Sequence, residues 1–326
     1  MAHRQTVRLQ GIGGQSKPTQ PAGAGYYHGF EPPHSQVSSL AVKLERLLHR
    51  EDFRASPARA LARRLLWRLR WAMTSRPWRL ATSYGFPLWI GKTGSGALIY
   101  YQGASEPQAL RFLSRYLREG MIVADVGAHF GEFAVFCALA VGGHGAVHAF
   151  EPHAEMFALL ERNIAELGLA QVTLNLCAVG EADGEAEFWE RTEPASSSLA
   201  PQRAADREVR RVRRVPVCSL DSYFARRAAA PHLIKADVEG AERRVILGAR
   251  ELCSLPPGRA PLWLLEYSVS ACARAGENAE AITATLQQFG YRCYGLDEEG
   301  TPRPWVPPPA PHFPTVHLIA SKQELT

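Results

Sequence analysis

The sequence predicts an α/β fold in which a mostly parallel sheet is covered by helices on both faces. From about residue 105 onward, short apolar runs alternate with helical segments, which is typical of a parallel sheet built from strand–helix units. A glycine-containing loop, residues 127–131, directly follows the first of these runs. With 326 residues, of which 46% are hydrophobic and 21% charged, the chain is long enough for one large domain and a flanking segment.

The composition excludes several classes of protein. The chain is too apolar to be disordered throughout, it is not collagen-like, and its scattered cysteines exclude a small disulfide scaffold. No CxxC pair indicates a zinc site or a redox dithiol, and a reducing, cytoplasmic compartment is expected. There is no apolar leader and no run of about 18 apolar residues, which predicts a soluble protein. The cysteines are Cys137, Cys177, Cys218, Cys253, Cys272 and Cys293.

The N-terminal part of the chain is predicted to differ from the rest. Residues 1–80 hold 14 Lys and Arg against 4 Asp and Glu, whereas the remainder holds 23 against 28, so a basic extension precedes a mildly acidic domain. Residues 1–36, rich in Gly, Pro, Ser and Gln, predict a flexible tail. Residues 37–104 predict a basic helical extension followed by a β-hairpin, with strands at 86–90 and 97–101 around a glycine-rich turn.

The helical pattern in this extension is amphipathic, and two interpretations of it stay open. Residues 56–73 either form an interfacial helix that meets anionic lipid or a glycan, with the tryptophan rings in the headgroup zone, or pack on the main domain while the arginine side chains extend to water. The apolar face comprises Leu61, Leu65, Leu69, Ala72 and Met73, and the mostly opposite face comprises Arg59, Arg63, Arg64, Arg68 and Arg70, with Trp67 and Trp71 among them.

The elements of the main domain, residues 105–326, follow from short apolar runs and from helical periodicity. A Ser- and Arg-rich insertion is expected at 191–214, and its arginines are either a binding site for a phosphate or acidic sugar or a solvated face. Strands are expected at 122–126, 146–150, 172–178, 186–189, 233–237, 262–267, 292–295 and 315–320, and helices at 132–140, 154–167, 241–247 and 278–289.

Two carboxylates at the expected sheet edge indicate a nucleoside site. Asp125 ends the first strand of the domain, and the loop after it leads into a helix whose N-terminus has free N–H groups. Gly127 and Gly131 allow the backbone to turn sharply and to approach a ligand. Glu151 follows the second strand, at the position from which a carboxylate binds both ribose hydroxyls of an adenosine.

The loop spacing favours a cationic nucleoside over a dinucleotide. A dinucleotide fingerprint needs G-x-G-x-x-G, whereas this loop has glycines only at 127 and 131, with an acid two residues before the first. That acid would repel a diphosphate and suit a positively charged cofactor such as S-adenosylmethionine. An NAD-dependent oxidoreductase is therefore a weaker alternative.

Over about residues 105–295 the sequence resembles the FkbM family of S-adenosylmethionine-dependent methyltransferases. The resemblance implies a Rossmann-like class I methyltransferase fold with a seven-stranded sheet whose final strand is antiparallel. It also implies methylation of hydroxyl oxygens on sugars and natural products. The segments that carry it are DVGAHFGEF (125–133), AFEPHAEMFALLERNI (149–164), LCAVGEADG (176–184), SLDSY (219–223), LIKADVEGAE (233–242) and LLEYS (264–268), in the family's order.

The resemblance assigns roles on the cofactor side that agree with the motifs. It implies that Asp125, Gly127 and Gly131 form the cofactor loop, that Glu151 binds the ribose, and that Ala178 and Val179 lie beside the adenine. The family usually has Asn where this loop has His129, which is bulkier and can titrate. We expect His129 to contribute to the cofactor loop by packing or hydrogen bonding, and catalysis by it is the alternative.

LIKADVEGAE predicts a second cluster, on the acceptor side. Lys235 and Asp237 alternate along a strand and so point the same way, at the carboxyl end where ligands of open α/β sheets bind. Transfer to a hydroxyl needs a base, a metal or close positioning. Asp237 or Glu239 would accept the proton or hold a divalent cation, and Lys235 would orient the acceptor. The alternative is a structural Lys235–Glu239 ion pair, with Glu242 capping the helix.

Further acceptor contacts are expected from the next strand and from the insertion. Glu266 follows an apolar run, where an unpaired acid is costly, so it is a candidate for acceptor or metal contact; a solvent-exposed strand end is the alternative. Ser197 and Ser198, next to Ser196, lie where the family often has a serine-rich segment facing the acceptor, although they are equally compatible with a plain loop.

These observations predict an S-adenosylmethionine-dependent O-methyltransferase acting on a hydroxyl of a saccharide or secondary metabolite. A nucleic-acid methyltransferase is one alternative, favoured by the basic N-terminus but opposed by the lack of a [DN]PP[YF] motif after the fourth strand, so no nucleic-acid partner is expected. A non-catalytic adaptor with a vestigial nucleoside site is another, opposed by Asp125, Glu151 and Asp237 at one sheet edge. The acceptor's identity and the oligomeric state do not follow from the sequence.

Overall fold

The computed structural model describes residues 53–54, 56–199, 208–227, 229–308 and 316–325, all within one compact unit, Arg50–Thr326. The predicted tail, residues 1–36, lies outside the described residues, as does the start of the predicted extension. Among the described residues, no helix is both long enough and apolar enough to cross a membrane.

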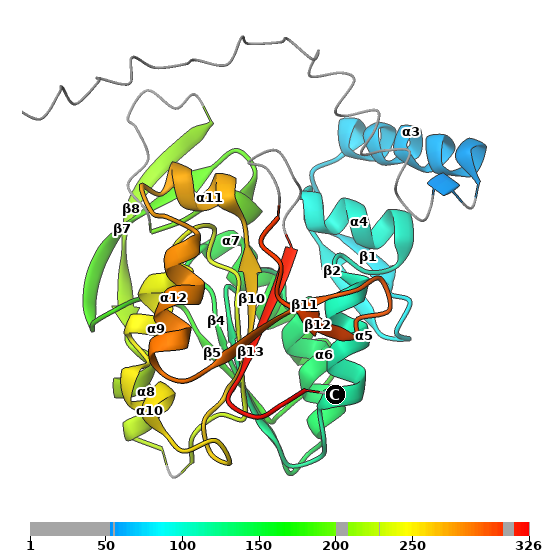
Figure 1. Ribbon diagram of the computed structural model, residues 1–326. Coiled ribbons are helices and arrows are strands. Elements are labelled where there is room, and N and C mark those ends of the chain that lie inside the picture. The colour runs from blue at the N-terminus through cyan, green and yellow to red at the C-terminus, as the bar shows by residue number, and fades with distance from the viewer. Residues whose placement is uncertain (1–52, 55, 200–207, 228, 309–315, 326) are drawn as a thin grey trace, which may run out of the picture. The chain divides into compact units, whose positions relative to one another are not determined.

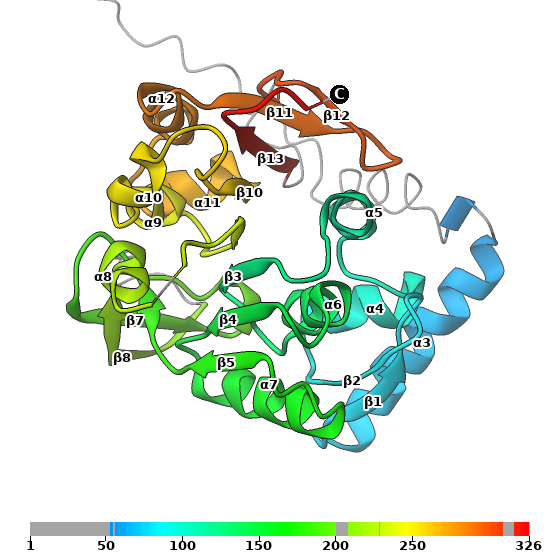
Figure 2. The same ribbon diagram turned by 90° about the horizontal axis from the view of Figure 1, so that it is seen from below.

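Within the described residues the main sheet has eight strands, in the order β12-β11-β13-β10-β9-β3-β4-β5 (Figures 1 and 2). The five strands β10, β9, β3, β4 and β5 are parallel to one another. Strand β13 runs antiparallel to both its neighbours, β10 and β11. This is the class I methyltransferase sheet that was expected, with the short edge strand β12 added. The strands are β3 Ile122–Val126, β4 Ala146–Phe150, β5 Val172–Asn175, β9 Leu233–Ala236, β10 Leu262–Tyr267, β11 Arg292–Leu296, β12 Pro302–Pro304 and β13 Val316–Ser321.

Helices cover both faces of this sheet (Figure 2). One apolar core contains residues from α5, α6 and α7, and the core on the opposite face contains residues from α8, α9, α10, α11 and α12. Strand residues alternate between these cores: Val123 belongs to the first, and Ala124 and Val126 to the second. The helices are α5 Pro107–Tyr116, α6 Glu132–Val141, α7 Ala154–Glu166, α8 Leu220–Ala225, α9 Glu242–Leu247, α10 Arg250–Ser254, α11 Val269–Arg274 and α12 Glu280–Gln288.

Between β5 and α8 the chain forms a second, smaller sheet, to which the insertion contributes the first part of β8. Strands β6 Ala178–Val179, β7 Gly184–Arg191 and β8 Val209–Cys218 pair in the order β6-β8-β7. The strand expected at 172–178 therefore ends at Asn175 in the main sheet, and residues 178–179 join the second sheet instead. Two of the arginines predicted for an anion site form ion pairs across this sheet, Arg213 with Glu190 at 3.4 Å and Arg214 with Glu185 at 3.8 Å.

The predicted hairpin is present, and its strand at 86–90 is confirmed, but the second strand is a different one. It pairs β1 Trp78–Ala81 with β2 Pro87–Ile90, and residues 97–101 lie in helix α4, Gly94–Gln102. The β-prone residues of this segment were misleading because the helix has strong end signals. The Thr93 side chain accepts a hydrogen bond from Gly96 N, and Gly103 ends the helix in the left-handed conformation, with φ 89°.

Helix α3, Pro57–Met73, confirms the predicted helix but reverses its orientation. Its buried residues are Ala60, Trp67 and Trp71, whereas the leucines are exposed. The prediction that tryptophan rings lie in a headgroup zone is therefore wrong, because these rings pack inside the protein. Trp67 stacks on Trp78 and Tyr100, with ring centroids 6.2 and 5.8 Å apart.

Candidate active site

A cavity opens where β3 and β9 lie side by side. The chain runs outward from β3 to β5 and then crosses back to β9, and such a switch point is where open α/β sheets bind ligands. The empty space between its walls, including the part open to solvent, is about 800 Å³. Its walls include Gly127, His129, Glu151, Ala178, Val179, Ser197, Ser198, Lys235 and Asp237, all of which were predicted from the sequence.

The loop between β3 and α6 has a backbone that requires glycine. Gly127 has φ 77°, and a Cβ there would lie 1.9 Å from the carbonyl oxygen of Asp237. Gly131 has φ 95°, and a Cβ would lie 2.5 Å from Leu160 Cδ1. The loop is thus pressed against two other segments, and any side chain at Gly127 would separate it from the segment after β9.

Asp125 and Lys235 are register partners on adjacent strands, which explains their proximity. Lys235 Nζ lies 3.5 Å from Asp125 Oδ1 and 3.7 Å from Asp237 Oδ2, and it donates a 3.0 Å hydrogen bond to Gly127 O. Burial disfavours the charged form, but the carboxylates of Asp125 and Asp237 outweigh it and raise the pKa of Lys235. The ammonium therefore stays charged and connects the glycine loop to both carboxylates.

Asp125 is fully buried and is not saturated by protein donors. Neither of its carboxylate oxygens accepts a hydrogen bond within the described part of the chain. Burial raises the pKa of Asp125, and the nearby Lys235 opposes this shift. A buried carboxylate is costly unless a cation or a donor offsets it; Lys235 Nζ, 3.5 Å from Oδ1, offsets Asp125, which does not itself line the cavity.

Glu151 is held rigidly by backbone amides. Its Oε2 accepts from His129 N and its Oε1 from His153 N, both at 2.7 Å. Burial raises the pKa of Glu151 to about 7, although both of these hydrogen bonds lower it. Each oxygen keeps a second lone pair, so the fixed carboxylate can still accept from a pair of ligand hydroxyls.

His129 contributes its backbone to this arrangement. It is a non-glycine residue with φ 52°, and this left-handed conformation directs its N–H to Glu151. Burial, followed by the neighbouring Lys235 and His153, lowers the pKa of its imidazole to about 3, so the ring is neutral at physiological pH. Its Nε2 has no hydrogen-bond partner among the described residues, which leaves it available to a ligand.

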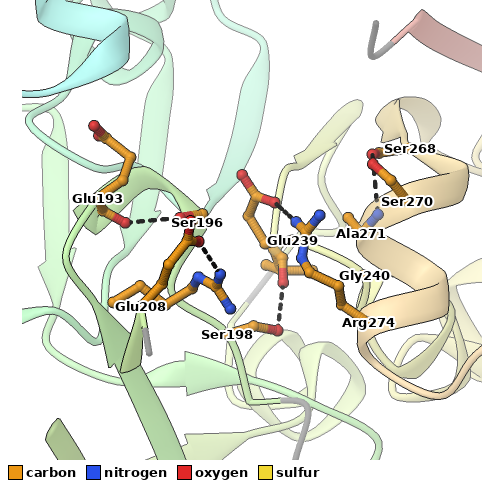
Figure 3. A network of polar contacts seen from close by, with 12 residues as sticks. Glu193, Ser196, Ser198, Glu208, Glu239, Gly240, Ser268, Ser270, Ala271 and Arg274 are labelled. Atoms are coloured by element: carbon orange, nitrogen blue, oxygen red, sulfur yellow. Dashed lines mark hydrogen bonds and ion pairs between the residues drawn. The ribbon is translucent and has the colours of Figure 1, made fainter. Parts of the chain in front are cut away.

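On the acceptor side the structure separates the two acids that were predicted to act together. Asp237 has 27% of its side chain exposed and lines the cavity. Glu239 does not line it and pairs with Arg274, 3.2 Å away, as Figure 3 shows. The alternative Lys235–Glu239 ion pair is therefore wrong. Burial, and then Asp237, raises the pKa of Glu239 to about 8.

Glu242 closes the loop between β9 and α9. Its Oε1 accepts from Val238 N at 3.1 Å and from Gly240 N at 3.2 Å, so its role is to satisfy backbone donors at the start of the helix, much as the capping alternative predicted. Burial raises the pKa of Glu242 to about 7, against the effect of these hydrogen bonds.

Glu266 lies beside Asp237, as its place at the end of β10 predicted, but not on the cavity wall. Its Oε2 has no hydrogen-bond partner among the described residues. Burial, then the charges of Asp237 and Glu239, raises its pKa well above the ordinary value, which favours its protonated form.

The carboxylates spaced for a metal ion differ from the predicted pair. Among the described residues, ligand oxygens of Asp237, Glu242 and Glu266 lie within 4.8 Å of one another. Glu239, the predicted partner of Asp237, is not in this group and is directed to Arg274 instead. Glu242 is already engaged by backbone donors, and Lys235 supplies a positive charge to Asp237.

Ser197 and Ser198 line the cavity but are engaged with the protein. Ser197 Oγ accepts from Arg191 N at 3.0 Å, and Ser198 Oγ donates to Val238 O at 3.1 Å, next to Asp237 (Figure 3). The serines therefore connect the insertion to the segment that carries Asp237. Ser196 instead bonds to Glu193 O within its own short turn.

A group of polar residues on the cavity wall was not predicted from the sequence. Glu132 accepts hydrogen bonds from Ser105 N and Oγ, and burial raises the pKa of Glu132 to about 7. Glu106 pairs with His317, 2.6 Å away and 211 positions later in the chain. An acid in the first turn of an otherwise apolar helix was an available signal for Glu132, whereas nothing in the sequence pairs Glu106 with His317.

Comparison with known proteins places this site in a family. The model of the methyltransferase FkbM domain matches residues 125–293. The 31-O-demethyl-FK506 methyltransferase FkbM of Streptomyces tacrolimicus is 31% identical over 194 residues, which cover 48% of this chain and 74% of that protein.

Two solved structures are also similar to this chain. The methyltransferase FkbM from Methylobacillus flagellatus is 18% identical, over 82% of this chain and 60% of that one, with a TM-score of 0.43. The S-adenosylmethionine-dependent O-methyltransferase from Thermotoga maritima is 16% identical, over 75% of this chain and 77% of that one, with a TM-score of 0.40. On the strength of the domain match over residues 125–293, the chain belongs to the FkbM family of S-adenosylmethionine-dependent methyltransferases.

Proposed function

We propose that the chain transfers a methyl group to a hydroxyl oxygen of a saccharide or secondary metabolite. The observation that carries this proposal is Asp237, a partly exposed carboxylate on the cavity wall at the carboxyl end of β9. The name of the Streptomyces relative, a 31-O-demethyl-FK506 methyltransferase, describes transfer to oxygen on a natural product and supports the same class of acceptor.

The residues of the other half of the cavity fit S-adenosylmethionine. Gly127 has no side chain, so a ligand can approach its backbone closely. Asp125 has buried oxygens that accept no hydrogen bond from the described residues, and Glu151 has a carboxylate held in place by backbone amides. Asp125 would take a cationic or hydroxyl donor, Glu151 the ribose hydroxyls, and Ala178 and Val179 the adenine. When bound, the cofactor supplies a methyl group on a positively charged sulfur.

Asp237 is the group best placed to accept the hydroxyl proton. The charged Lys235 lies 3.7 Å from Asp237 Oδ2, and Asp237 lines the cavity, whereas Glu239 and Glu266 do not. A positioned base of this kind contributes about 10²–10⁴-fold to a rate.

Lys235 serves as a positioning residue in this scheme. The contacts described for its Nζ are with Gly127 O, Asp125 and Asp237, so it holds the loop and the two carboxylates in register. Its charge stays in place when Asp237 gains a proton, which keeps the geometry of the site constant.

The charge of the cavity wall favours a neutral hydroxylated acceptor over a nucleic acid. Glu106, Glu132, Glu151 and Asp237 line the cavity, whereas its ammonium, Lys235, lies between carboxylates. Phosphate groups bind where unpaired Lys and Arg side chains gather, and an acidic wall repels them.

The decisive experiment measures cofactor binding first and transfer second. Calorimetric titration with S-adenosylhomocysteine, with NADH as the parallel ligand, is expected to show micromolar binding of the first alone, about 8 kcal/mol. The protein is then incubated with methyl-labelled S-adenosylmethionine and a panel of saccharides, hydroxylated macrolides, amines and a short RNA. Label on a hydroxyl supports the proposal, whereas label on RNA or only on amines overturns it.

A further inference from the structure

Helix α3 presents a continuous apolar face to solvent. At 3.6 residues per turn, one side of the helix carries the positions i, i+3, i+4, i+7, i+8 and i+11 counted from Ala58, and every one of them is Ala, Leu or Met. The large side chains of this face, which we call the leucine face, are between 50% and 83% exposed. They are Leu61, Leu65, Leu66, Leu69 and Met73.

The opposite side of the helix fixes this orientation. Trp67 and Trp71 are buried, and Trp67 packs against Trp78, Tyr100 and Tyr101. Arg63 Nη1 donates a 2.8 Å hydrogen bond to Tyr101 O. An aromatic and cationic side thus docks on the body of the protein while the leucine face points away, which reverses the usual order for a helix of a globular domain.

The leucine face is bordered by positive charge. Arg68 and Arg59 lie at its two edges on the helical wheel, and both are exposed. The helix carries Arg at five positions and no Asp or Glu. Exposed leucines between arginines, on a helix that has no acid of its own, match the anionic headgroups and the apolar acyl chains of a lipid bilayer.

We propose that α3 anchors the protein to an anionic membrane, with the leucine face inserted at the boundary between headgroups and acyl chains. The helix lies in the plane of the interface and does not cross it. A second copy of the chain fits the same face less well, because two such helices would bring arginines together without an acidic partner. This inference does not depend on the proposed acceptor.

The test is cosedimentation of the full chain with sucrose-loaded vesicles, either phosphatidylcholine alone or phosphatidylcholine with about a quarter phosphatidylglycerol. We expect binding to the anionic vesicles, and a Leu65→Gln, Leu69→Gln variant to bind about a hundredfold more weakly. Leu139→Gln, Leu176→Gln is the matched control, because these leucines are 51% and 49% exposed elsewhere on the surface, and it should bind like the unaltered chain.

A second variant separates charge from apolar contact. Arg59→Gln, Arg68→Gln should lose about thirtyfold on anionic vesicles and little on neutral ones, since each basic side chain near such a surface contributes separately. An unchanged titration with S-adenosylhomocysteine shows that each variant is folded. The proposal is overturned if the unaltered chain does not sediment with anionic vesicles, if the two leucine variants bind equally, or if Leu65→Gln, Leu69→Gln instead dissolves a dimer.

Discussion

The two halves of the cavity are built in different ways. On the cofactor side, backbone groups set the geometry: amides of His129 and His153 fix Glu151, and the bare backbone of Gly127 touches Asp237 O. On the acceptor side, charge sets it: burial and the neighbouring charge of Asp237 raise the pKa values of Glu239 and Glu266. The first half should therefore respond to changes of shape, and the second to changes of charge.

Gly127→Ala should have the largest effect, because it tests shape directly. The added Cβ would lie 1.9 Å from a backbone oxygen in a conformation that L-residues rarely adopt. We expect no measurable binding of S-adenosylhomocysteine by calorimetry, and a free energy of unfolding lower by about 3–5 kcal/mol. Gly143→Ala is the matched control, since a Cβ there meets nothing within 4 Å. Normal binding of S-adenosylhomocysteine by the Gly127→Ala variant would show that the loop is not closely packed against the segment after β9.

Asp237→Asn tests charge without changing shape. Removal of the base should lower the rate of methyl transfer about 10²–10⁴-fold, with the dissociation constant of S-adenosylhomocysteine changed less than about threefold. Added EDTA should leave the rate of the unaltered enzyme unchanged, because Glu239 is paired with Arg274 and Glu242 with backbone amides. Loss of activity in EDTA that Mg²⁺ restores would instead make Asp237, Glu242 and Glu266 metal ligands.

Glu151→Ala should affect cofactor binding alone. Two charge-assisted hydrogen bonds to the ribose would be lost, which weakens the binding of S-adenosylhomocysteine by about 2–4 kcal/mol. Glu155→Ala, an exposed acid four residues later, is the calorimetric control. An affinity equal to that of the control would remove Glu151 from the cofactor site.

Glu132→Gln should have the smallest effect on ligand binding, and its effect on stability should appear only above pH 4.5. Burial raises the pKa of Glu132 from 4.5 to about 7. The protein therefore has its full stability below pH 4.5, where Glu132 is protonated in both the folded and the unfolded state. It loses part of that stability as the pH rises through 7 and the buried carboxyl ionises. The glutamine variant should therefore gain about 3 kcal/mol of unfolding free energy over the unaltered protein between pH 4.5 and 7.5. Urea titrations across this range measure it, with the exposed Glu119→Gln as control. A constant difference would mean that Glu132 does not titrate on folding.

The sequence predicted the main sheet and the cofactor half because both depend on local patterns. Strand periodicity, a glycine loop and an acid after β4 lie within 30 residues of one another. The predictions that proved wrong concern features that depend on tertiary packing. Residues 97–101 have β-prone side chains but form part of helix α4, whose ends are fixed by Thr93 and Gly103. The leucines of α3 are exposed because Trp67 and Trp71, on the other side of the helix, are buried, with Trp67 packed against Tyr100.

The acceptor half was only partly predictable, because its pairs join distant segments. Asp237 was correctly placed at the end of β9, since strand alternation fixes it. The partner of Glu239 proved to be Arg274, 35 positions away, and that of Glu106 proved to be His317. Such ion pairs depend on where the tertiary fold places α11 and β13, which spacing along the chain does not encode.

The contact between Gly127 and the carbonyl of Asp237 joins the two halves mechanically. With no side chain between them, and with Lys235 Nζ bonded to Gly127 O at 3.0 Å, neither loop can shift without the other. We therefore expect positive cooperativity: a ligand that fixes the position of one loop should increase the affinity of the other loop for its own ligand. By thermodynamic reciprocity, the factor by which the cofactor tightens acceptor binding equals the factor by which the acceptor tightens cofactor binding.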